Sequence, residues 1–175
     1  MFTMKKLLPF AGFCAAVLGI VALILVLATK SVGLSSNVAD TQWASGIQGL
    51  FGQPKTDSQG EIKATVGAVI AFILVIVGLV LALLASLLPM LKKAENIAGF
   101  LGLGASVALV IAGILLFCEV PMYCSARGVD VSGSTLGLTY KYVLGGGWVV
   151  AGILAVVGGG VAFLPSLFAF LAKKK

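Results

Sequence analysis

Four long apolar stretches alternate with polar segments along this chain of 175 residues. They occupy residues 7–28, 65–88, 97–117 and 142–164, and none has an Asp, Glu, Lys, Arg or His in its interior. Each is long enough to cross about 30 Å of hydrocarbon as a helix, which takes about 20 residues. The pattern therefore predicts an all-α membrane protein in which four transmembrane helices form a bundle.

The polar segments between these spans are too short to form a second folded unit. The longest, residues 29–64, could not build a core of its own without cross-links. Residues 89–96 form a short turn, residues 118–141 a second loop and residues 165–175 a tail. We therefore assign residues 1–175 to one membrane domain. The composition agrees, because only 10% of the residues are charged, against about 25% in soluble domains.

The distribution of lysines predicts which side of the membrane each polar segment occupies. Seven cations lie before the first span, in the short turn and in the tail, where Glu95 is the one acid. The two longer loops carry five basic and five acidic residues and are therefore neutral. By the positive-inside rule, both termini and the turn are cytoplasmic, the longer loops lie outside, and the plasma membrane is the expected location.

The net charge of +6 does not indicate a nucleic-acid partner. Its lysines are spread over three short sites, and no basic face exceeds three residues, whereas nucleic-acid binding needs a clustered basic patch. The lipid bilayer is the partner that these lysines predict, because they lie where anionic head groups are expected.

Small residues recur at four-residue spacing in the first, third and fourth spans. This spacing places them on one helix face, and small side chains let helices pack closely in lipid. The rows are Ala11, Ala15 and Gly19; Ala98, Gly102 and Ser106; and Gly147, Ala151, Ala155 and Gly159. They predict close packing of the helices within one subunit or, most plausibly for the row of the fourth span, contact between subunits.

In the first loop, an apolar stripe predicts a short amphipathic helix. Trp43, Ile47, Leu50 and Phe51 are spaced as on one helix face, and Asp40 is available as the N-cap. This helix could lie at the outer membrane–water interface. Alternatively, its stripe could pack on the ends of the membrane helices or dock a partner. For Trp43 we expect interfacial anchoring or, as the alternative, recognition of a partner.

In the second loop, alternating apolar residues predict a β-hairpin. The alternation runs through residues 129–131 and 136–140, on both sides of a turn at residues 132–134. Tyr140, Tyr142 and Trp148 then begin the fourth span as an aromatic belt. The hairpin and the first-loop helix would together make a small extracytoplasmic cap on the bundle.

The cysteines and the absence of histidine limit which disulfide, metal and catalytic sites the chain could form. Cys118 and Cys124 lie on the predicted outer side, where a local disulfide could form if that side is oxidising. A zinc site is disfavoured, because two thiols and no histidine do not complete its ligand set. No nucleophile–base set and no phosphate loop is recognisable. We therefore expect no cofactor, no metal and no enzymatic activity.

The layout of four spans, internal termini and a larger first outer loop resembles that of the claudin and peripheral-myelin-protein tetraspans. Trp43 and Gly49-Leu50-Phe51 are similar to the Trp and Gly-Leu-Trp motif of their first loop. The two cysteines that follow the motif in those proteins are missing here, and the loop is short. The resemblance therefore implies a layout, and no residue role is transferred.

These observations predict a structural or assembly protein of the membrane. It would associate with itself or with other membrane subunits through its small-residue faces and outer loops. The alternative is a pore or transport component that forms only on oligomerisation, because one bundle with this apolar interior has no polar path.

Overall fold

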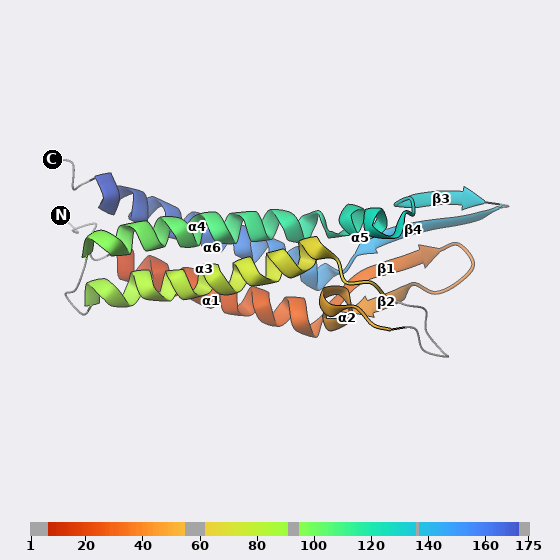
Figure 1. Ribbon diagram of the computed structural model, residues 1–175, viewed down its shortest axis with the longest axis horizontal. Coiled ribbons are helices and arrows are strands. Elements are labelled where there is room, and N and C mark those ends of the chain that lie inside the picture. The colour runs from red at the N-terminus through yellow and green to blue at the C-terminus, as the bar shows by residue number, and fades with distance from the viewer. Residues whose placement is uncertain (1–6, 55–61, 91–94, 136, 172–175) are drawn as a thin grey trace.

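The computed structural model describes residues 7–54, 62–90, 95–135 and 137–171 (Figure 1). Four of its helices are long and apolar enough to cross a membrane, as expected of a helical membrane-embedded protein. They are α1 (Leu7–Ala28), α3 (Val66–Met90), α4 (Glu95–Phe117) and α6 (Gly146–Leu171).

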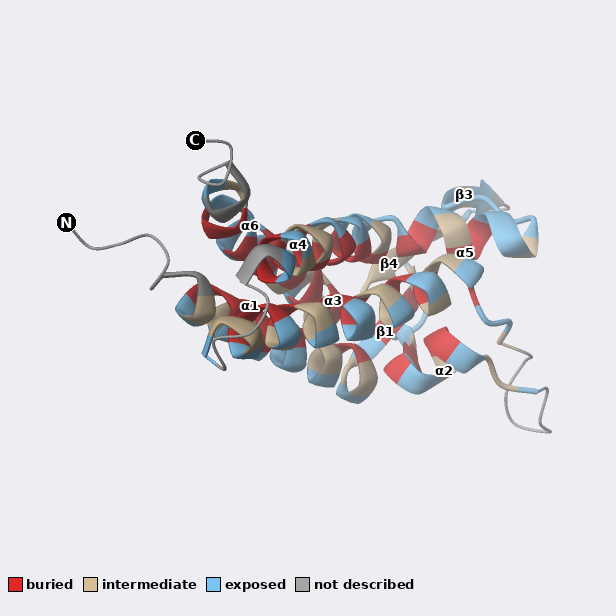
Figure 2. Cartoon of the chain, turned by 60° about the vertical axis from the view of Figure 1, so that its left-hand side comes forward, coloured by how far each residue is buried: buried red, intermediate tan, exposed pale blue. Residues whose placement is uncertain are grey.

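The four long helices form a ring of neighbours. α1 packs against α3 and α6, and α4 packs against the same two helices. The start of α1 and the end of α6 lie at one end of the bundle, and the cap lies at the other (Figure 1). Buried residues line the faces that the helices turn toward one another (Figure 2). The apolar core of the bundle is therefore shared by all four helices.

Both ends of the fourth span differ from the prediction. Residues 142–144 belong to a strand, so α6 begins only at Gly146. At its other end α6 continues through Pro165 to Leu171, where a tail was expected. A proline in a helix removes one backbone hydrogen bond. Ser166, the next residue, is buried against Gly102 of α4, so α6 remains packed on the bundle beyond the proline.

The cap is built around a β-sheet of four strands, which is larger than the single hairpin that the sequence predicted at this end of the molecule. Its antiparallel strands occur in the order β2-β1-β4-β3. They are β1 (Lys30–Ser36), β2 (Gln42–Ser45), β3 (Ser132–Thr135) and β4 (Leu138–Leu144). Because β1 pairs with β4, the sheet joins the two loops. Two short helices, α2 (Gly46–Phe51) and α5 (Glu119–Arg127), complete the cap.

The first-loop helix is shorter than predicted and begins later. Trp43 belongs to β2, where its ring lies over Gly33 of β1. The N-cap of α2 is Ser45 and not Asp40, and Ser45 forms a capping box with Gln48. A serine followed three residues later by glutamine is a helix-start signal, and it takes precedence over the apolar spacing that included Trp43.

In the second loop, β3 and β4 form an antiparallel hairpin whose turn is displaced from the predicted one. Residues 132–134 belong to β3, and Thr135 pairs with Leu138. The turn thus includes Gly137, whose φ of 82° favours glycine. Position 136, which we expected in the second strand, lies outside the described residues.

Candidate functional site

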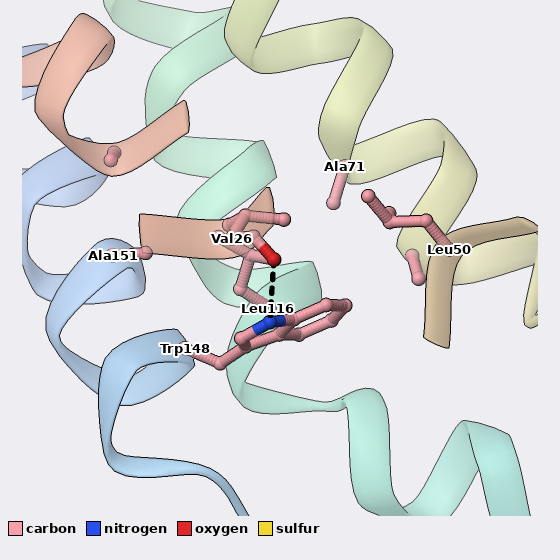
Figure 3. Packing of buried hydrophobic residues seen from close by; sticks show 8 residues of the cluster. Val26, Leu50, Ala71, Leu116, Trp148 and Ala151 are labelled. Carbon is pink, nitrogen blue, oxygen red and sulfur yellow. Dashed lines mark hydrogen bonds between the residues drawn. The ribbon is translucent and has the colours of Figure 1, made fainter. Parts of the chain in front are cut away.

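The junction between the bundle and the cap contains the largest fully buried side chain, that of Trp148. Its Nε1 donates a hydrogen bond of 3.0 Å to the carbonyl oxygen of Val26, in the last turn of α1 (Figure 3). The last carbonyls of a helix have no partner within the helix, so Trp148 satisfies one of them. Leu50 and Leu116 belong to the same buried cluster. Trp148 is therefore a core residue that ties α6 to α1, and not part of a surface belt.

Close backbone contacts seat the cap directly on the bundle. The amide of Gly145 donates to the carbonyl oxygen of Ser31 at 2.5 Å. A Cβ at Gly46 would lie 2.9 Å from the carbonyl oxygens of Leu27 and Thr29, which is closer than a side chain allows. α2 thus approaches the end of α1, and the link from β4 to α6 approaches β1, with no space for a side chain between them, so the cap has a fixed position on the helices.

Glu119, the first residue of α5, is completely buried at this junction. Within the described part of the chain, neither carboxylate oxygen has a hydrogen-bond partner of good geometry, and the hydroxyl of buried Thr65 has none either. Burial raises the pKa of Glu119 to about 7, although the neighbouring Thr65 hydroxyl acts in the opposite direction. A charged carboxylate without a partner is costly in an apolar interior, so Glu119 is a site where a proton is held near neutral pH.

The surroundings of this acid are largely apolar. Val32, Val120, Tyr123 and Cys124 form the buried cluster between α5 and the sheet. The Tyr123 ring lies under Arg127, whose guanidinium carbon is 4.5 Å from the ring centroid. Burial raises the pKa of Tyr123 and of the Cys124 thiol, and the positive charge of Arg127 counteracts both shifts.

From the sequence, Glu119 is expected to be one of the loop charges, and its burial is not predicted. A signal was present, because Glu119, Val120, Tyr123 and Cys124 have the spacing of one helix face. All four of these residues are buried on α5. The acid therefore lies on the apolar side of a short amphipathic helix, although the spacing alone does not tell that this side is covered.

The small-residue rows lie in contacts between helices of the same chain. The members of the rows on α1 and α4 are buried, as are Ala151, Ala155 and Gly159 of α6, and Gly147 is partly buried against Thr29. A Cβ at Gly159 would lie 2.8 Å from the carbonyl oxygen of Ser106 on α4. These faces therefore bring the helices of one subunit together, and they leave little surface for another chain.

The four residues of the predicted first-loop stripe do not share one face. Leu50 is fully buried on the inner side of α2, whereas Ile47 and Phe51 of the same helix are 56% and 60% exposed. Trp43 is partly buried on the sheet. The structure therefore separates one core residue, two exposed apolar side chains and one strand residue.

The disulfide that the sequence allowed between Cys118 and Cys124 is not present in the structure. Cys118 is exposed, Cys124 is buried, and both are free, as is Cys14 in α1. Six residues of helix rise about 9 Å, which exceeds the distance of about 7 Å between Cα atoms that a disulfide can bridge. The helical path from Cys118 to Cys124 therefore keeps the two thiols apart.

Comparisons with known proteins do not assign a family: no family model matches the chain, and no curated protein is similar to it. In the part of the chain that the structure describes, no three His, Cys, Asp or Glu side chains form a group that could hold a metal ion. Among the described residues, the distinctive chemistry of the junction is thus one buried acid, Glu119, at the base of a fixed cap.

Proposed function

We propose that this chain is a non-enzymatic structural or assembly protein of the membrane, which binds other membrane subunits or a second copy through its cap. The observation that carries this proposal is the joining of both loops into one sheet that sits directly on the helix ends. Such a sheet presents its side chains at a fixed height above the bilayer, which a binding surface requires.

The division of surfaces between the bundle and the cap supports this assignment. The small-residue faces are occupied by helix contacts inside the chain. The outward positions of the long helices carry large apolar side chains suited to lipid tails. The sheet, in contrast, has β2 and β3 as its outer strands, and edge strands readily pair with other chains. Exposed apolar residues also lie in the cap, among them Val38, Val129, Val131 and Leu138.

The lysine distribution supports an orientation with the cap outside and both termini in the cytoplasm, in the plasma membrane. In that orientation, partners would be other membrane proteins with exposed outer loops. The alternative function, an oligomeric pore, receives less support. The buried hydroxyls of Ser86 and Ser166 lie in helix contacts, with Ser86 donating to the Ala82 carbonyl oxygen at 2.8 Å and Ser166 facing Gly102.

Native mass spectrometry of particles extracted gently from the native membrane tests the proposal. We expect a complex with different subunits or with further copies. Val38→Asp and Val131→Asp place a charge on exposed apolar positions of the two hairpins, and we expect at least one of them to release the partner. Asp130→Asn, beside Val131, changes the charge without altering an apolar position and should leave the complex intact.

Two results would overturn the proposal. One is a wild-type chain that is extracted alone under all gentle conditions. The other is a complex that survives both Asp substitutions in variants whose thermal unfolding matches that of the wild type, because the cap would then not be the contact surface.

A further inference from the structure

Helix α2 lies at the ends of the transmembrane helices, and its apolar side chains reach back along them. Leu50 packs in one cluster with Ala71 of α3 and Val26 of α1. The Phe51 ring makes an edge-to-face contact with the ring of Phe72, with centroids 6.1 Å apart. Phe72 is about 9 Å along α3 from its first residue. The Phe51 side chain therefore reaches the first turns of α3, where the apolar span begins, while the backbone of α2 lies at the level of the helix ends.

At this depth, α2 turns an apolar face away from the protein. Ile47 and Phe51 are one helical turn apart, which places them on the same face, and both are more than half exposed. On α3, Ile70 and Ile73 are also exposed, at 45% and 51%, and they belong to the membrane-spanning surface. The exposed face of α2 thus continues a surface that lipid covers.

The polar groups of α2 are arranged for a location at the edge of the hydrocarbon. The Gln48 side chain accepts from the Ser45 amide at 2.9 Å and also donates to Gln53. The Gly52 amide donates to the Gln48 carbonyl oxygen at 2.9 Å. Backbone and side-chain groups with internal partners can enter a region that is poor in water.

A lysine–tryptophan pair lies next to α2 on the sheet. Lys30 Nζ is 5.7 Å from the centroid of the Trp43 ring, and both residue types favour the membrane–water boundary. We infer that α2 is an interfacial anchor, whose Ile47 and Phe51 side chains insert among the acyl chains of the leaflet on the cap side.

Spin labels in vesicles of phosphatidylcholine with phosphatidylglycerol test this placement. Nitroxides are attached at Ile47→Cys, Phe51→Cys, Val38→Cys and Ile73→Cys, in a background in which the three native cysteines are replaced. Frequent collision of a nitroxide with oxygen indicates that it lies in lipid, and frequent collision with a water-soluble nickel complex indicates that it lies in water. We expect positions 47 and 51 to share the high oxygen-to-nickel ratio of position 73, and position 38, at the tip of a hairpin, to show the low ratio of water.

Two other outcomes overturn the inference. A low ratio at positions 47 and 51, like that of position 38, would place α2 in water. Low collision rates with both reagents would mean that a second copy or another protein covers it. If the cysteine-free background does not fold, Phe51→Trp and Val38→Trp are made in a Trp43→Phe chain. Brominated phosphatidylcholine should then strongly quench the tryptophan fluorescence of the Phe51→Trp variant. The fluorescence of the Val38→Trp variant should be quenched no more than that of the Trp43→Phe parent chain.

Discussion

Glu119 is the residue whose surroundings differ most from those its chemistry favours. It is fully buried beside Thr65, and its carboxylate oxygens have no hydrogen-bond partner of good geometry among the described residues. Burial raises its pKa from 4.5 to about 7. The folded chain therefore keeps this proton up to about pH 7, whereas the unfolded chain releases it near pH 4.5. Between these values the unfolded state binds fewer protons, so the stability of the fold decreases as the pH rises.

We therefore expect the wild-type chain to unfold at a lower temperature at pH 8 than at pH 5. The pKa shift of Glu119 corresponds to a loss of about 3 kcal/mol, at about 1.4 kcal/mol per unit. Glu119→Gln keeps the shape and stays neutral, so its unfolding temperature should be higher than that of the wild type at pH 8 and nearly constant across this range. The fluorescence of buried Trp148 can follow the transition in detergent.

Asp40→Asn is the matched control, because Asp40 is an exposed acid of the same cap. It should keep the pH dependence of the wild type. If Glu119→Gln shows the same dependence as the wild type, the buried carboxyl is not the group that titrates.

At the scale of elements, the four spans were predictable because lipid imposes their length and composition. Their ends at the cap were not, because residues 142–145 are apolar enough for either a strand or a helix. The sheet was not predictable from local patterns, since β1 pairs with a strand that follows two further spans. The Ser45–Gln48 capping box is visible in the sequence, but the apolar spacing from Trp43 predicts an earlier helix start than the structure has.

Two adjacent glycines of α6 test how the helices are packed. A Cβ at Gly159 would lie 2.8 Å from the Ser106 carbonyl oxygen and 2.7 Å from Val110, whereas one at Gly160 would meet nothing within 4 Å. We expect Gly159→Ala to destabilise the bundle by about 1–3 kcal/mol, because α4 and α6 must move apart. Gly160→Ala should be neutral or stabilising by up to about 1 kcal/mol, because alanine favours the helix.

Unfolding in mixtures of a mild detergent and dodecyl sulfate measures both variants under the same conditions. Equal stabilities for the two variants would mean that α4 and α6 do not cross at Gly159.

At the scale of the whole molecule, the cap and the two ends of the described chain lie at opposite ends of the bundle (Figure 1). The lysines predict that the cap is outside. Cys118 provides a natural reporter, because it is an exposed thiol at the cap end, whereas Cys124 is buried and Cys14 lies within a span.

A maleimide that cannot cross membranes should therefore label intact cells at Cys118. The Cys118→Ser variant should lose nearly all of the label, since burial also raises the pKa of the Cys124 thiol and disfavours its reactive form. Labelling that appears only after the cells are permeabilised would place the cap in the cytoplasm and reverse the predicted orientation.

The pairing of β1 with β4 also determines the order in which the chain can be completed during synthesis. β1 leaves the ribosome directly after α1, but its partner β4 comes after α3 and α4. The Asn37 side chain likewise bonds to backbone groups of Gly137 and Thr139, which are 100 and 102 residues further on. Until they arrive, one edge of β1 stays unpaired and open to other strands. The cap thus closes only late in synthesis, just before α6 completes the bundle, and a chain that stops short of β4 never closes it.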